Sequence, residues 1–96
     1  MLTSKQRAYL RGLANPLDTI LQVGKSGIAD MLVKQIDDAL TARELIKVRV
    51  LETSPESVRD IAGQLADATK SEVVQVIGTK FVLFRRNNKK PVIELN

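Results

Sequence analysis

Residues 19–40 read TILQVGKSGIADMLVKQIDDAL and contain a strand, a loop and the start of a helix. The first part, residues 19–23, is apolar and partly β-branched, which predicts a short strand. From residue 28 onward an apolar side chain recurs every four residues, and this stripe predicts a helix over residues 28–43. The GKSG segment, residues 24–27, is the loop between them. The stretch therefore predicts an α/β domain with two glycines at a strand–helix joint.

Two more helices are predicted, one on each side of this unit. Thr3 or Ser4 can cap a helix over about residues 4–14. Ser54-Pro55-Glu56 combines a capping hydroxyl, a proline at the first helical position and an acid in the first turn, and predicts a helix over about residues 55–69.

Three further strands follow from alternation and turn residues. The segment IKVRV, residues 46–50, alternates apolar side chains with Lys47 and Arg49, which predicts a half-buried strand. Two strand-like runs, residues 72–77 and 80–86, flank Gly78-Thr79 and predict a hairpin.

The predicted order is α-β-α-β-α-β-β, a two-layer α/β fold in one domain over residues 1–96. Strand–helix–strand units favour parallel neighbours, and the hairpin adds an antiparallel strand. We therefore expect a four-stranded mixed sheet with helices mainly on one face, and Lys47 and Arg49 on the partly open face. Residues 87–96 form a basic tail, in which VIEL is either a short edge strand or no regular element.

Composition excludes several classes of chemistry. The 96 residues contain no Cys and no His, which removes disulfides, Cys/His zinc sites and His-based triads. No apolar run approaches the roughly 18 residues of a membrane helix, and we expect a protein of the reducing cytoplasm. The net charge of +4 is uneven, with +3 over residues 1–29, −2 over residues 30–70 and +3 over residues 71–96. A polyanionic partner is therefore expected to meet the two ends.

The GKSG loop matches neither nucleotide motif. A P-loop would need glycine at residue 19, which is Thr19, and the dinucleotide fingerprint G-x-G-x-x-G is absent. Two interpretations of G-x-x-G stay open: a turn that needs glycine dihedral angles, or a clamp for a sugar–phosphate strand at a helix N-terminus. Lys25 and the preceding basic helix favour the clamp. The carboxylates form no catalytic motif, so we expect no enzyme activity and no nucleotide cofactor.

Four blocks in order, SKQRAYLRGLA, LQVGKSGI, LTARELIKVRV and VVQVIGTKFVLFRR, resemble the YhbY family. These are bacterial stand-alone versions of the CRM domain (chloroplast RNA splicing and ribosome maturation). The resemblance covers about residues 2–86, with Phe84 where relatives often have tyrosine. It implies RNA binding, association with precursors of the large ribosomal subunit and no catalytic activity. It also implies a fold like the C-terminal domain of translation initiation factor three.

The resemblance further implies that the loop and adjoining basic surface meet RNA. The candidate RNA-binding residues are Gly24, Lys25, Ser26 and Gly27 in the loop, Lys5, Arg7 and Arg11 on the first helix, and Lys80, Arg85 and Arg86 on the closing hairpin. No metal site and no membrane contact are expected. The alternative is a protein-interaction module that docks through its open sheet face. Steep salt dependence of binding would favour RNA over a protein partner.

Overall fold

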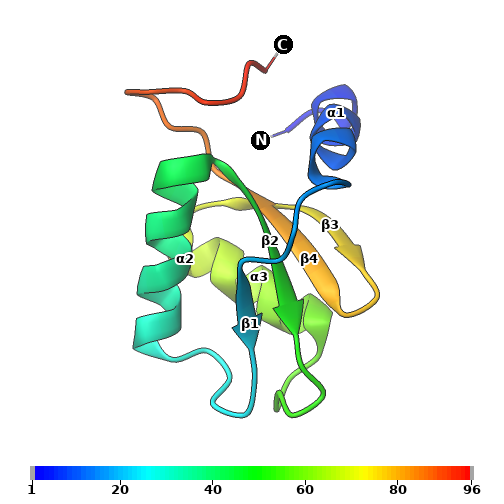
Figure 1. Cartoon of the computed structure of the whole chain (residues 1–96), viewed down its shortest axis with the longest axis vertical. Helices are drawn as coiled ribbons and strands as arrows, with labels where there is room; N and C mark the ends of the chain where they lie inside the picture. The colour runs from blue at the N-terminus through cyan, green and yellow to red at the C-terminus, as the bar shows by residue number, and fades with distance from the viewer. Residues whose placement is uncertain (1, 96) are drawn as a thin grey trace.

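The chain folds into three helices and a four-stranded sheet in the expected order, which confirms the α/β fold class (Figure 1). This computed structural model describes residues 2–95. The helices are α1 (Ser4–Ala14), α2 (Asp30–Arg43) and α3 (Val58–Thr69). The strands are β1 (Leu21–Val23), β2 (Leu45–Val50), β3 (Glu72–Ile77) and β4 (Lys80–Phe84). The likeness to the C-terminal domain of translation initiation factor three stays a prediction.

The strand order is β1-β2-β4-β3, so the last strand of the sequence lies inside the sheet. β1 is parallel to β2, whereas β4 is antiparallel to both β2 and β3. The expectation of parallel neighbours therefore holds for β1 and β2. It is wrong for β2 and β3, because β4 lies between these two strands. Four consecutive residues of β4, from Phe81 to Phe84, are buried. A strand that is buried on both faces belongs in the interior of a sheet, which explains the insertion.

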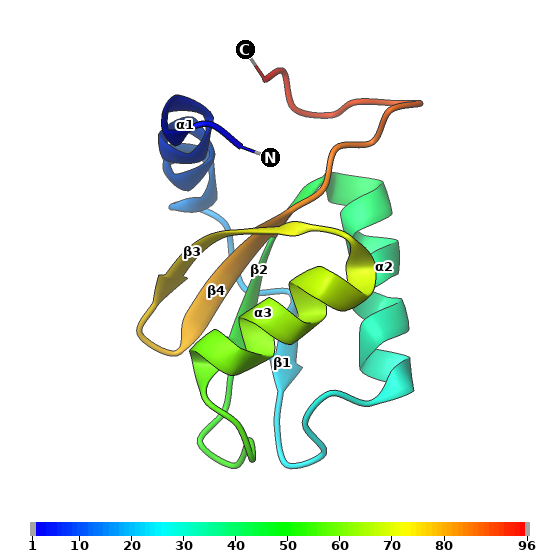
Figure 2. The same cartoon turned by 180° about the vertical axis from the view of Figure 1, so that it is seen from behind.

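The two faces of the sheet are covered unequally. α2 and α3 pack on one face, where Ile36 and Ile61 join Phe81 in the larger core cluster (Figure 2). On the other face, Leu10 of α1 packs with Phe84 in a smaller cluster that the C-terminal tail completes. Two helices on one face and one on the other confirm the expected arrangement. Phe81 and Phe84 lie on opposite faces, as their spacing predicts, and both are buried.

Helix starts follow local hydrogen bonding. α1 begins as predicted, because Thr3 and Gln6 form reciprocal capping bonds. α3 begins at Val58, so the predicted start at residue 55 is wrong. The Ser57 side chain accepts the Asp60 backbone N–H and caps the helix, while Ser54 bonds within the preceding turn.

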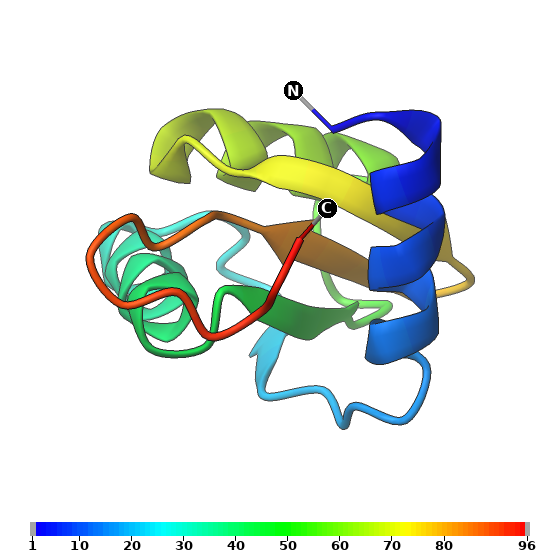
Figure 3. The same ribbon diagram turned by 90° about the horizontal axis from the view of Figure 1, so that it is seen from above.

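The C-terminal tail runs back over the sheet without forming a strand (Figure 3). Its VIEL segment takes no regular structure up to Leu95, and residue 96 lies outside the described residues. The tail is instead held by Glu44, the C-cap of α2, whose buried carboxylate accepts backbone N–H groups of Asn87, Val92 and Ile93 at 2.6 Å each. Ile93 and Leu95 pack against the smaller core cluster. We call this arrangement the Glu44 clasp.

Candidate functional site

The GKSG loop lies at one end of the molecule beside the loop that joins β2 to α3 (Figure 1). Gly27 is buried and has φ +62°, and a Cβ there would lie 3.2 Å from Cγ of Pro55. Gly27 is therefore required by the turn itself. At Gly24 a Cβ would make only ordinary contacts, 3.5 Å from Leu51 and from Thr53. The turn interpretation thus accounts for Gly27 and leaves Gly24 unexplained.

The loop offers one cation. Lys25 and Ser26 are exposed, but α2 begins only at Asp30, with Ala29 as an N-cap that makes no side-chain hydrogen bond. The predicted helix start at residue 28 is therefore too early, and the Ser26 hydroxyl does not cap the helix. Asp30 places an exposed carboxylate in the first turn of α2. Electrostatic attraction for phosphate at this loop consequently depends on the Lys25 ammonium group.

The basic residues of α1 do not adjoin the loop. α1 lies towards the opposite end of the molecule, next to the C-terminal tail (Figure 1). The Arg7 guanidinium donates a hydrogen bond to the Val73 carbonyl and ties α1 to β3. Lys5 and Arg11 are exposed. The predicted residues of the loop and those of α1 therefore lie in two separate places.

Arg85 serves the packing of three elements. Its guanidinium donates to the Asp37 carboxylate and carbonyl oxygen, to Oγ1 of Thr41 at 2.8 Å and to the Thr69 carbonyl at 2.8 Å. These bonds join the end of β4 to α2 and to the end of α3, and they occupy the fork of donors that a phosphate would need. Its neighbour Arg86 is exposed.

The structure brings Lys80 next to two basic residues that are not among the predicted RNA-binding residues. In the β2–β4 ladder Lys80 lies directly opposite Arg49, and Lys47 lies two residues along β2 on the same face. This face points away from α2 and α3, because Val48 and Phe81 of the same strands belong to the core beneath those helices. We call Lys47, Arg49 and Lys80 the basic sheet face. Arg49 and Lys80 are exposed, and within residues 2–95 neither forms an ion pair.

The alternation of IKVRV places Lys47 and Arg49 on the open face from sequence alone. The sequence alone does not predict that Lys80 lies beside them, because this depends on β4 pairing with β2 inside the sheet and not at the edge of the sheet.

In the part of the chain that the structure describes, no group of three or more His, Cys, Asp or Glu residues is arranged to hold a metal ion. Over the same residues, none of the helices combines the length and apolar character needed to cross a membrane.

Comparison with known proteins gives a consistent family. Over 95 residues the chain is 46% identical to the Probable RNA-binding protein YqeI of Bacillus subtilis, covering 99% of both chains. It is 33% identical over 91 residues to an RNA-binding protein of Haemophilus influenzae, covering 95% of this chain and 92% of the other. The solution structure of the hypothetical protein SAV1595 from Staphylococcus aureus superimposes with a TM-score of 0.83, at 49% identity and full coverage of both chains. Residues 2–85 match the CRS1 / YhbY (CRM) domain, and the chain belongs to that family.

Proposed function

We propose that this chain is a non-enzymatic RNA-binding protein that contacts phosphates through the basic sheet face and Lys25. The observation that carries the proposal is the cross-strand pair of Arg49 and Lys80. Like charges directly opposite each other destabilise a strand pair, by an amount comparable to the roughly 0.2–1 kcal/mol of a favourable pair. A phosphate strand lying across β2 and β4 would neutralise both charges and release counterions. The names of the Bacillus and Haemophilus relatives support RNA as the partner.

We further propose that the RNA is ribosomal RNA of the large subunit or its precursor particle, bound in the cytoplasm during ribosome assembly. Four sequence blocks that resemble the YhbY family support this assignment. Sequencing of RNA crosslinked to the protein in cells tests it. Recovery of large-subunit ribosomal RNA is the expected result, and recovery of unrelated RNA would contradict this assignment while leaving RNA binding intact.

RNA binding itself is tested by neutralising the basic sheet face with the double variant Arg49→Gln/Lys80→Gln. Single-stranded RNA affinity should fall, and the slope of log affinity against log salt should shrink by about 1.4, since each phosphate contact in a single strand contributes about 0.7. The matched control is Lys34→Gln/Arg59→Gln, which removes the same charge from exposed positions on α2 and α3. The control should leave the salt slope unchanged.

The same measurement separates the alternatives. Equal losses in the double variant and its control would indicate a diffuse charge effect and contradict a defined surface. Absence of RNA binding by the unaltered protein would favour a protein-interaction module on the open sheet face. Lys25→Ala should reduce the slope by about one contact. An unchanged slope would place Lys25 off the RNA path.

A further inference from the structure

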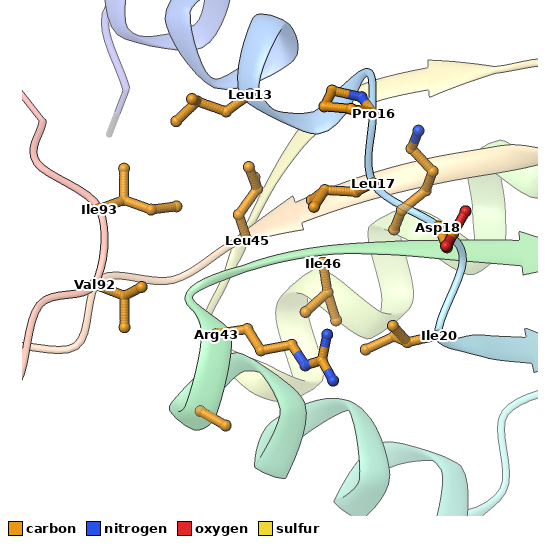
Figure 4. A pocket seen from close by; sticks show the side chains of 12 residues that line it. Leu13, Pro16, Leu17, Asp18, Ile20, Arg43, Leu45, Ile46, Val92 and Ile93 are labelled. Atoms are coloured by element: carbon orange, nitrogen blue, oxygen red, sulfur yellow. The ribbon is translucent and has the colours of Figure 1, made fainter.

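A groove of about 580 Å³ opens between the end of α1, the end of α2, the start of β2 and the C-terminal tail (Figure 4). Its walls are mainly aliphatic. They include Leu13, Leu17, Ile20, Leu45, Val92 and Ile93. Leu13, Leu17 and Val92 remain 37%, 38% and 62% exposed. The volume lies within the roughly 300–1,000 Å³ that is typical of small-molecule sites, and a mostly apolar lining is also typical.

The Glu44 clasp builds one wall of this groove. Val92 and Ile93 line it, and the backbone N–H groups of these two residues bond to the buried Glu44 carboxylate. A buried carboxylate with three N–H partners fixes the tail in one position. The groove is thus a formed feature of the fold, with a wall that comes from a distant part of the chain.

The polar side chains of the groove favour a nucleic acid over a purely apolar occupant. Arg43 and Lys47 supply two cations against the single carboxylate of Asp18, and Figure 4 shows Arg43 reaching across the groove towards Ile20. The Lys47 ammonium donates to the Asn15 carbonyl, 3.3 Å away, which holds it at the end of α1. Carboxylates accept hydrogen bonds from exocyclic amino groups of bases, and arginine donates to base oxygen and nitrogen atoms.

We propose that this groove receives one unpaired nucleobase of the bound RNA. The inference rests on the proposed function, because Lys47 belongs both to the groove and to the basic sheet face. A phosphate strand that crosses β2 and β4 at Arg49 and Lys80 and then turns towards Lys47 would reach the groove at the start of β2. A base turned out of that strand would enter among the aliphatic side chains, with its edge towards Asp18 and Arg43. Recognition of splayed, unstacked bases is the usual route to selectivity for single-stranded RNA.

The test fills the groove and leaves every charge in place. Ala42 lines the groove from an exposed position on α2, and leucine is a good helix former, so Ala42→Leu adds bulk inside the groove. The matched control is Ala68→Leu, at an exposed position on α3 that is not part of the groove. Two probes are compared at fixed salt: a single-stranded RNA and the duplex formed with its complement, in which the bases are paired.

Ala42→Leu should weaken single-stranded RNA binding by about tenfold. Binding of the duplex and the salt slope should not change, and Ala68→Leu should change neither. Unaltered single-strand affinity in a folded Ala42→Leu protein would overturn the groove proposal. The same result is expected if the groove binds an apolar protein segment and not a nucleobase. An equal loss for both probes would also overturn it. In either case the loss caused by Arg49→Gln/Lys80→Gln would still stand, so the proposed function would survive.

A second measurement needs no variant. A single-stranded RNA that contains 4-thiouridine is crosslinked to the unaltered protein, and the attached peptides are identified. Crosslinks within residues 13–20 or at residues 92 and 93 are expected. Crosslinks confined to residues outside the groove would overturn the proposal even if Ala42→Leu failed to fold.

Discussion

Glu44 and Val92 are joined by a 2.6 Å hydrogen bond between residues 48 positions apart, in which the Val92 backbone N–H donates to the Glu44 carboxylate. Burial of this carboxylate raises its pKa, but three backbone N–H donors and the nearby Arg86 outweigh burial and hold the pKa below its ordinary value of 4.5. Glu44 also has φ +64°, a conformation that favours glycine. A non-glycine residue in this conformation is expected to make contacts that offset the backbone strain. In Glu44 these contacts are the hydrogen bonds that its carboxylate accepts from the C-terminal tail.

Replacing Glu44 by glutamine should destabilise the protein by about 1–3 kcal/mol, because the amide offers one acceptor oxygen where both carboxylate oxygens accept N–H groups. Thermal unfolding followed by circular dichroism should show a melting temperature lower by about 4–8 °C for each kcal/mol. Amide exchange should accelerate at Val92 and Ile93 more than at core residues of β4. A variant as stable as the parent would show that the clasp contributes nothing to the fold.

Acidification should remove the contribution of Glu44. Because its folded pKa lies below the unfolded value, the carboxylate stabilises the fold above about pH 4.5, and this stabilisation is lost as the pH falls towards the folded pKa. The melting-temperature gap between the parent and Glu44→Gln should therefore narrow between about pH 6 and about pH 3. The other carboxylates are common to both proteins and cancel in the difference. A gap that stays constant over this range would contradict the assignment.

Arg85 and Arg86 should differ in how much each contributes to the stability of the fold. Arg85→Gln should cost about 1–3 kcal/mol of stability, since it breaks charge-assisted bonds to Asp37, Thr41 and Thr69. Arg86→Gln is the matched control, since it removes the same charge from the next, exposed position; it loses only the attraction between Arg86 and the Glu44 carboxylate, and it should cost less stability than Arg85→Gln. Urea titrations of the two variants measure the difference. If Arg86→Gln were the more destabilising change, the bonding of Arg85 would not be what holds β4 to the helices.

The two loop glycines should respond differently to alanine. Gly27→Ala should lose about 1–2 kcal/mol of stability, because of its positive φ and the close approach to Pro55. Gly24→Ala meets only ordinary contacts and should fold as stably as the parent. Reduced RNA affinity in this folded variant would indicate that a strand passes close to Gly24. Normal affinity would leave the whole GKSG segment as a structural turn.

Much of the fold could be predicted because its signals are local. The capping box of α1 involves residues three apart, and the β3–β4 hairpin follows from Gly78, which has φ +59°. Local signals also misled. Ser54-Pro55-Glu56 has the composition of a helix start, yet Ser57 caps the helix, since several hydroxyls compete within a few residues and backbone geometry decides among them.

The candidate site was harder to predict, since its relationships span the sheet. Arg49 and Lys80 become neighbours only through the strand order, and the Arg85 guanidinium meets Asp37 across 48 positions of sequence. Charge counting places both Arg85 and Lys80 in one basic segment. The structure separates them into an arginine used for packing and a lysine that faces solvent.

The interior position of β4 affects how this protein folds while it is being synthesised. A ribosome releases the chain from its N-terminus, so β2 and β3 emerge before the strand that pairs with both of them. Until residues 80–84 appear, each of these strands presents an unpaired edge, and Phe81 and Phe84 are missing from the two hydrophobic clusters. The four-stranded sheet therefore cannot close until β4 has been released. A nascent chain stalled before residue 80 has two open edges available for misassembly with its neighbours or for capture by a chaperone.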